Sequence, residues 1–217
     1  MAKLTGPLMS LGARGQLGKT LVMSKWRGVP YARQHVVPTN PQTNAQQVVR
    51  KTFALLREMW KVAPSQVIDT WNSFAQGRPF LGVNKWVGEN VRVLNGQPDM
   101  ANAILSPGSK GGPGPLTVAA VAGANPGEID VTVTVPVAPN GWTLNKLVAS
   151  AFHDQSPADF FTGPFVAAEA AAPANTVTLT GLGAAEACIV GIWLVWTKPD
   201  GSLAYSVSSV VEAASGA

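Results

Sequence analysis

The chain has 217 residues, of which 46% are hydrophobic and 13% are charged, and its formal net charge is +4. This apolar content is enough to build packed cores and excludes a largely disordered chain. The charges are sorted along the sequence: residues 1–112 hold 14 Lys and Arg against 4 Asp and Glu, and residues 113–217 hold 2 against 8. This asymmetry predicts two modules in different surroundings, the first of them with an anionic or acidic partner.

Signals for export, membrane insertion and disulfide bonding are missing from the sequence. The N-terminal segment lacks the apolar core of about 7–15 residues that a secretory signal needs. The longest apolar run, Cys188–Trp196, is much shorter than the roughly 20 residues of a spanning helix. Cys188 is the only cysteine, which excludes an internal disulfide and a cysteine-cluster metal site, and we interpret it as a buried apolar residue. We therefore expect a soluble chain, made in a cytosol, with no membrane partner.

The first forty residues are rich in glycine, and β-branched and aromatic residues lie between the glycines. Two short stretches, residues 20–26 and 29–36, have the composition of strands. Glycine at this density favours turns over helix, so the segment predicts β-hairpins or an extended arm. The glycines concerned are Gly6, Gly12, Gly15, Gly18 and Gly28.

The segment Gly12–Thr20 resembles a phosphate-binding loop only superficially. A P-loop needs a glycine, four intervening residues and then Gly-Lys-Ser/Thr at the start of a helix. Here Ala13 stands where the first glycine belongs, and the residues after Thr20 are typical of a strand. We interpret the segment as a glycine-rich turn and expect no nucleotide hydrolysis.

A three-helix unit is predicted between Pro41 and the second half of the chain. Thr43 and Gln46 fit a capping box, and the apolar stripe that follows has helical spacing over five or six turns. Pro64 separates this helix from a second one, which Gly77 and Pro79 end, and residues 84–94 form a third candidate. The stripe consists of Ala45, Val49, Phe53, Leu56, Trp60 and Ala63, with Arg50, Lys51, Arg57 and Lys61 largely outside it.

Residues 106–115 (SPGSKGGPGP) have the composition of a linker, and the sign of the charge changes there. We therefore place a domain boundary in this segment. The expected organisation is a basic arm and helical docking domain at 1–105, a linker at 106–115, and a separate domain at 116–217.

The C-terminal part predicts a β-sandwich. Residues 128–135 alternate Ile and Val with Asp and Thr, the pattern of a half-buried antiparallel strand. Similar short segments follow, and Pro199-Asp-Gly201 is a strong hairpin turn. About seven strands in roughly 100 residues are typical of a sandwich, so the expected fold class is α+β. The other expected strands are 116–121, 146–152, 176–180, 187–196 and 203–210.

Two of these segments resemble known domains. Thr178–Leu182, a turn of small residues and then Ala187–Trp196 are similar to the E strand, loop and F strand of fibronectin type III-like domains. Such domains usually carry a tyrosine near the start of the F strand, where this chain has Ala187 and Cys188. A general immunoglobulin-like sandwich is therefore an equal alternative.

The N-terminal 95 residues resemble tailed-bacteriophage structural proteins, which open with a glycine-rich segment and continue through an N-P-x-T-x-x-Q-x-x-x-R helix. The resemblance implies a virion component, in the head, neck or tail, to which an immunoglobulin-like domain is appended. The residues that carry it are Trp26-Arg-Gly28, Tyr31-Ala-Arg33, Asn40-Pro-Gln-Thr43, Gln46-Gln47, Arg50, Phe53, Trp60, Trp71 and Ala75.

Candidate catalytic and metal-binding groups are sparse. His153 is followed by Asp154, but no nucleophile or second base accompanies them in the sequence. Asp154, Asp159 and Glu169 lack the tight alternation of a calcium loop. We expect no enzymatic activity, no catalytic residue, no metal site and no cofactor.

The basic half is the candidate binding region, because Arg beside aromatic residues is typical of protein interfaces and of nucleic-acid grooves. A solvated face without a partner is the plain alternative. The candidate partner-binding residues are Arg14, Lys19, Lys25, Trp26, Arg27, Tyr31, Arg33, Arg50 and Arg57.

Two functions are consistent with these features. The first is a virion structural protein that docks to copies of itself and to other virion proteins through its basic half. Its sandwich would serve as a capsid or tail decoration or as a weak adhesion module for a host-surface glycan. The second is an architectural DNA-binding protein, because residues 60–75 resemble the helical core of HMG boxes. In that segment the pair Trp60 and Trp71 is better explained as core packing.

Overall fold

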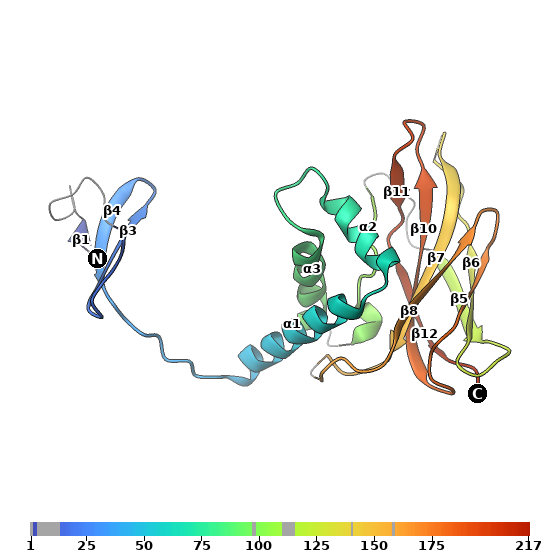
Figure 1. Ribbon diagram of the computed structural model, residues 1–217, viewed down its shortest axis with the longest axis horizontal. Coiled ribbons are helices and arrows are strands. Elements are labelled where there is room, and N and C mark those ends of the chain that lie inside the picture. Colours follow the sequence, from blue (N-terminus) through green and yellow to red (C-terminus); the bar gives the residue numbers. More distant parts are fainter. Residues whose placement is uncertain (1, 4–13, 97–98, 110–115, 140, 158) are drawn as a thin grey trace. The chain divides into compact units, whose positions relative to one another are not determined.

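The computed structural model describes residues 2–3, 14–96, 99–109, 116–139, 141–157 and 159–217 (Figure 1). It has an α+β fold, in which a small N-terminal sheet is followed by helices and then by a β-sandwich. The chain forms two compact units, Met1–Thr43 and Asn44–Ala217. None of the helices in the described ranges is long and apolar enough to cross a membrane.

The first unit is a four-stranded antiparallel sheet in the order β1-β4-β3-β2. Its strands are β1 (Ala2–Lys3), β2 (Gly15–Leu17), β3 (Leu21–Trp26) and β4 (Val29–Gln34). The predicted hairpins are thus present. Arg27 and Gly28 join β3 to β4 with φ angles of 46° and 87°. Two left-handed residues in a two-residue loop match the right-handed twist of a hairpin, and glycine takes such a conformation without strain.

The second unit begins with the three predicted helices, α1 (Asn44–Val62), α2 (Ser65–Ala75) and α3 (Gly82–Gly96), and with a short 3-10 helix, η1 (Met100–Asn102). The buried side of α1 differs from the predicted stripe. Thr52, Leu55, Leu56 and Met59 are buried, whereas Phe53 is 52% exposed. Leu56 therefore belongs to the core as predicted, but the N-terminal half of the stripe does not.

The sandwich consists of two antiparallel sheets. One is formed by β5 (Thr117–Ala122), β6 (Ile129–Thr134) and β9 (Thr176–Leu179). The other has the order β11-β10-β7-β8, with β12 also paired to β10. Its strands are β7 (Thr143–His153), β8 (Phe165–Ala171), β10 (Ala187–Thr197), β11 (Leu203–Tyr205) and β12 (Ser209–Ala214). The Ala-rich strand β8 was not predicted, because apolar and polar residues do not alternate along it. The segment expected as one strand at 203–210 is divided into β11 and β12.

The five-stranded sheet is the middle of three layers, with the helices on one face and the three-stranded sheet on the other (Figure 1). Strand β10 shows this directly. Ile189, Trp193 and Val195 point into the core shared with the helices, whereas Val190 and Ile192 point into the core between the sheets. A strand covered on both faces is apolar at nearly every position, which accounts for the uninterrupted apolar run Cys188–Trp196 within β10.

The boundary between the units lies after Thr43 and not within the segment 106–115 that its composition indicated. Residues 106–109 are held against the sandwich: Ser106 is fully buried, and its Oγ donates to the backbone oxygen of Ser206 at 2.7 Å. The backbone N–H of Ser109 donates to the oxygen of Tyr205 at 2.8 Å. Residues 110–115 lie outside the described residues. The helices and the sandwich share a core, so they are not separate modules.

Candidate docking surface

The predicted binding residues of the first unit lie on its strands and turns. Arg14 precedes β2, Lys19 is in the turn between β2 and β3, and Arg27 is at the tip of the β3–β4 hairpin. All three side chains are exposed. The segment compared with a P-loop thus continues through a turn, Gly18–Thr20, into a strand rather than a helix.

The register of β3 and β4 sorts the remaining residues between the two faces of the sheet. Trp26 pairs with Val29, Ser24 with Tyr31, and Lys25 with Pro30. Because directly paired residues share a face and neighbours along a strand alternate, Trp26, Tyr31 and Arg33 lie on one face and Lys25 lies on the other. One face therefore combines two aromatic rings with an Arg guanidinium.

The aromatic and basic groups of this unit are accessible. Trp26 is 69% exposed, and the Cζ atom of Arg27 lies 5.8 Å from the centroid of its ring. Met23 is the only residue that is buried among those of the unit whose burial the structure describes. Such a sheet exposes much apolar surface for its size, and sheets of this kind depend on packing against something else.

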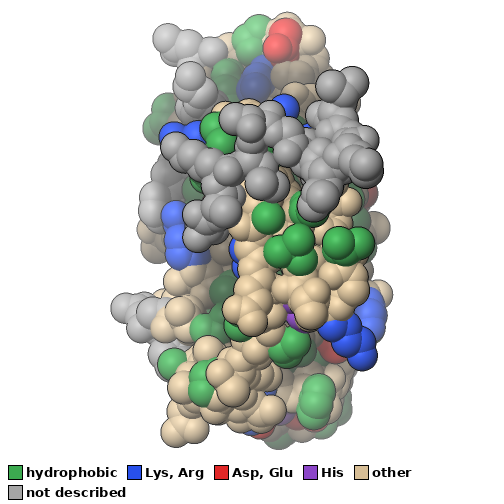
Figure 2. Space-filling view, turned by 90° about the vertical axis from the view of Figure 1, so that its left-hand side faces the viewer, with side chains coloured by type: hydrophobic (Ala, Val, Ile, Leu, Met, Phe, Trp, Pro, Cys, Tyr) green, Lys and Arg blue, Asp and Glu red, His purple; other side chains and the backbone are tan. Residues whose placement is uncertain are grey.

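The charge of the first unit is uncompensated within the unit. Residues 1–43 contain six Lys and Arg and neither Asp nor Glu, so no carboxylate of the unit can pair with them. The six are Lys3, Arg14, Lys19, Lys25, Arg27 and Arg33. Figure 2 shows Lys and Arg side chains beside hydrophobic ones on the surface of the molecule. A surface of this composition attracts an acidic partner over a Debye length of about 8–10 Å in physiological salt.

A second exposed surface with the same chemistry lies on α1. Val49 and Phe53 are 36% and 52% exposed, and Arg50 and Arg57 are exposed on the same helix. Phe53 and Arg57 also line a hollow of about 360 Å³ against α3, which contributes Val87, Val91 and other residues. Apolar side chains left in water beside Arg are the usual composition of an interface.

The structure thus distributes the nine predicted residues over two surfaces. Seven lie in the N-terminal sheet and its flanking turns, and Arg50 and Arg57 lie on α1 in the second unit. The contribution of Phe53 to the second surface was missed, because the helical spacing assigned it to the core. The neighbouring residue, Thr52, is buried instead. Its Oγ1 donates a hydrogen bond of 3.0 Å to the backbone oxygen of Val48.

Among the residues considered for chemistry, His153 of β7 and Cys188 of β10 are directly paired in the sheet. The Nδ1 atom of His153 lies 3.7 Å from Oε2 of Glu186, longer than a hydrogen bond. Cys188 is buried, and burial, with smaller contributions from the charges of Glu186 and Asp154, raises the pKa of its thiol to about 11. A thiol protonated at neutral pH is a poor nucleophile. Within the described ranges, no group of three or more His, Cys, Asp or Glu side chains could hold a metal ion.

Comparisons with known proteins give a distant structural likeness. No family model matches the chain, and no curated protein matches it. Among solved structures, the FN5 domain of Drosophila Lar is similar to 48% of this chain and 98% of its own length, at 15% identity and a TM-score of 0.34. The C-terminal sandwich of the present chain has three strands in the order β5-β6-β9 facing the sheet that contains β7, β8 and β10, which is the two-sheet architecture of immunoglobulin-like domains.

Proposed function

We propose that the chain is a non-enzymatic structural protein of a tailed-bacteriophage virion, built into the head, neck or tail. The N-terminal sheet and the exposed face of α1 dock it onto copies of itself and onto other virion proteins. The helices and the sandwich form the body, and the sandwich serves as a decoration or a weak adhesion module. The function consists of burying apolar and Arg-rich surface in repeated contacts, without a chemical step.

The observation that carries this proposal is the composition of the first unit. It combines an uncompensated set of Lys and Arg side chains with the exposed ring of Trp26. Aromatic residues and Arg are enriched where proteins bind one another. Two copies of this sheet would repel each other, so it suits an acidic surface. The C-terminal half, which has 2 Lys and Arg against 8 Asp and Glu, provides one on every copy.

The test is made on the full-length chain and on a fragment of residues 44–217, which contains both cores of the second unit. Electron microscopy of the concentrated full-length chain should show rings, tubes or shells, and the fragment should remain unassembled. Antibodies against the chain should label purified phage particles in immunogold images. A division at residue 105 is unsuitable, because it would expose the side of the core to which Trp193 contributes.

A charge-reversal variant makes the test specific. Lys25→Glu combined with Arg33→Glu should prevent assembly without unfolding the chain, since both side chains are exposed. The matched control is Lys198→Glu, a half-buried position beside the hairpin turn of the sandwich, where the ammonium lies 5.6 Å from the centroid of the Trp142 ring. Assembly that is unchanged in the double variant, or particles without label, would contradict the proposal.

Duplex DNA is the rival partner of the same basic surface. If the chain were an architectural DNA-binding protein, its affinity for duplex should fall linearly with salt on logarithmic axes. The resemblance of residues 60–75 to the helical core of an HMG box has little support, because both Trp residues of this segment pack against other residues of the chain. Trp71 is fully buried, and Trp60 packs against Trp86 with ring centroids 5.6 Å apart. If the chain binds duplex DNA in a salt-dependent way and the double variant abolishes this binding, the DNA-binding function would be favoured.

A further inference from the structure

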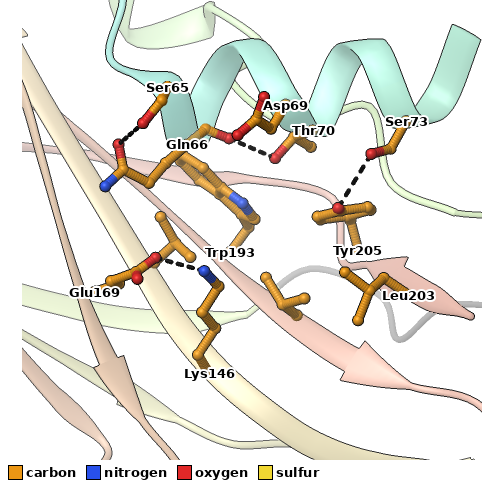
Figure 3. A pocket seen from close by; sticks show the side chains of 12 residues that line it. Ser65, Gln66, Asp69, Thr70, Ser73, Lys146, Glu169, Trp193, Leu203 and Tyr205 are labelled. Atoms are coloured by element: carbon orange, nitrogen blue, oxygen red, sulfur yellow. Dashed lines mark hydrogen bonds and ion pairs between the residues drawn. The ribbon is translucent and has the colours of Figure 1, made fainter. Parts of the chain in front are cut away.

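A polar groove lies between α2 and the five-stranded sheet, within the second unit (Figure 3). Its volume is about 440 Å³, within the range of about 300–1,000 Å³ that is usual for small-molecule sites. The groove does not overlap the candidate docking residues. Its composition also departs from the interface between a helix and a sheet, which is normally apolar.

The floor of the groove is formed by two neighbouring rows of the sheet. In one row, Val148 of β7 pairs with Trp193 of β10 and with Glu169 of β8. In the next row, Val195 of β10 pairs with Lys146 and with Tyr205. Nζ of Lys146 and Oε2 of Glu169 form an ion pair at 2.6 Å across the two rows. The floor thus presents one ion pair and the half-buried ring of Tyr205, and it also includes the fully buried ring of Trp193.

The roof is one side of α2. Ser65, Asp69 and Ser73 follow each other at intervals of four residues, so they form one polar stripe along the helix. The stripe Val67–Trp71–Ala75 has the same spacing and supplies three of the four buried residues of the helix, and the fourth, Thr70, lines the groove. The apolar stripe therefore supplies most of the buried contacts of α2, and the polar stripe supplies few of them. Its hydroxyl and carboxylate groups are available to the groove.

The buried indole of Trp193 supplies a donor without an acceptor. Its side chain is fully buried, and Nε1 has no hydrogen-bond partner among the described residues. Figure 3 shows the ring between Gln66 of α2 and Lys146 of β7, with its nitrogen on the side toward Tyr205. A buried donor that lacks an acceptor costs about 1–3 kcal/mol, so an oxygen atom that enters here would be stabilised.

We propose that this groove binds a neutral polyhydroxylated ligand, a sugar residue. Hydroxyl groups both donate and accept, as this lining requires. They can donate to the carboxylate of Asp69 and accept from Nε1 of Trp193 and from Nζ of Lys146. The hydroxyl of Tyr205, which donates to Oγ of Ser73 at 3.3 Å, adds an exchangeable partner at the rim. The ring of Tyr205 and the side chain of Leu203 offer apolar surface to the C–H groups of a sugar.

Other ligand classes fit the lining less well. Two carboxylates against one ammonium disfavour phosphate and other anions. A metal ion is disfavoured because one of the two carboxylates, Glu169, is engaged with Lys146. An apolar ligand would leave the polar stripe of α2 without partners.

This proposal rests on the adhesion role within the proposed function, for which it names the ligand class. The sugar-binding proposal and the virion assignment can be contradicted by separate experiments. Immunogold labelling of particles reports on the virion assignment, and sugar binding in solution reports on the groove. The sources of the sugar are also separable, since a free hexose and a surface polysaccharide share the same hydroxyl chemistry.

The experiment is a titration of the ¹⁵N-labelled full-length chain, followed by NMR at the indole N–H of Trp193. The resonance is assigned by its loss in Trp193→Phe. The probes are D-glucose, D-galactose, N-acetyl-D-glucosamine and the polymer dextran, with glycerol and inorganic phosphate as comparisons. At least one of the sugars should shift this resonance saturably, and the double variant Asp69→Ala and Ser73→Ala should weaken its binding about tenfold.

Trp86→Phe is the matched control, because Nε1 of Trp86 is also buried and has no partner in the part of the chain that the structure describes, but it lies on α3 outside the groove. It should leave the affinity unchanged. A response to a free sugar would identify a small ligand, and a response to dextran alone would identify a polymer. A Trp193 resonance that no sugar shifts would overturn the proposal. So would a response to phosphate alone, or a sugar affinity that the Asp69 and Ser73 variant leaves intact.

Discussion

The indole N–H of Trp71 donates a hydrogen bond of 2.9 Å to the backbone oxygen of Leu105, and both residues are fully buried. Leu105 in turn lies against β10, where Gly191 leaves room for its side chain. The segment after the helices is thereby fixed between α2 and the sheet. This relationship explains why residues 44–217 form one unit although their composition changes at residue 106.

The hydrogen bond predicts a loss of stability when its donor is removed. Trp71→Phe leaves the oxygen of Leu105 buried without that donor, at a cost of about 1–3 kcal/mol beyond the lost packing. Trp86→Phe loses similar packing but no hydrogen bond, because its Nε1 has no partner among the described residues. Urea unfolding should therefore show the larger decrease for Trp71→Phe. Equal decreases would show that the bond contributes nothing.

Two glycines are expected to respond to alanine in opposite directions. A Cβ atom at Gly191 would lie 2.2 Å from Cδ1 of Leu105, which is fully buried and cannot move aside freely. Gly191→Ala should therefore lower the free energy of unfolding by about 1–3 kcal/mol. A Cβ atom at Gly88 of α3 would meet no atom of the described residues within 4 Å apart from its chain neighbours and the backbone of its own helix, so Gly88→Ala should raise it by up to about 1 kcal/mol. Thermal and urea unfolding measure whether the free energy of unfolding decreases in the first variant and increases in the second.

The side of α1 that is buried can be tested by truncation. Leu56→Ala removes a fully buried side chain and should cost about 2–5 kcal/mol. Phe53→Ala removes a larger side chain that is half exposed, and should cost less than about 1 kcal/mol. If Phe53→Ala were instead as destabilising as Leu56→Ala, the stripe inferred from helical spacing would be the true core.

The pKa of Cys188 predicts a decrease in stability at alkaline pH. The folded chain holds the thiol proton up to a pKa of about 11, whereas an exposed thiol loses it near pH 8.5. This contribution is complete below about pH 8.5 and is lost as the pH rises to 11, with an upper limit of about 3 kcal/mol. Cys188→Ala should remove this part of the pH dependence. Parallel stability curves for the two proteins between pH 8 and 11 would contradict the prediction.

The first unit should be dispensable for the folding of the second. Residues 44–217 contain both hydrophobic cores, so the fragment should unfold cooperatively at nearly the midpoint of the full-length chain. Circular dichroism during heating provides the measurement. A fragment that melts broadly, or much earlier, would show that the N-terminal sheet completes the fold of the second unit.

Local pattern by itself determined the elements of this protein. The glycine-rich segments at the start, the prolines that separate the helices and the alternation in β6 depend only on neighbours in the chain, so the hairpins, the three helices and most of the strands could be predicted. The candidate cations are predictable for the same reason, because Lys and Arg rarely lie in a core. Strand β8 lacked a signal because its alanines suit several environments.

Only the tertiary structure decided which surfaces meet. Helical spacing shows that α1 is amphipathic but does not say how far along the helix a neighbour reaches, so Phe53 is exposed and Leu55 is buried. Similarly, a Gly- and Pro-rich composition permits a linker, but contacts such as that of Ser106 with Ser206 depend on residues about 100 positions away. One long-range signal was available in β10, whose apolar residues on both faces require a layer on each side.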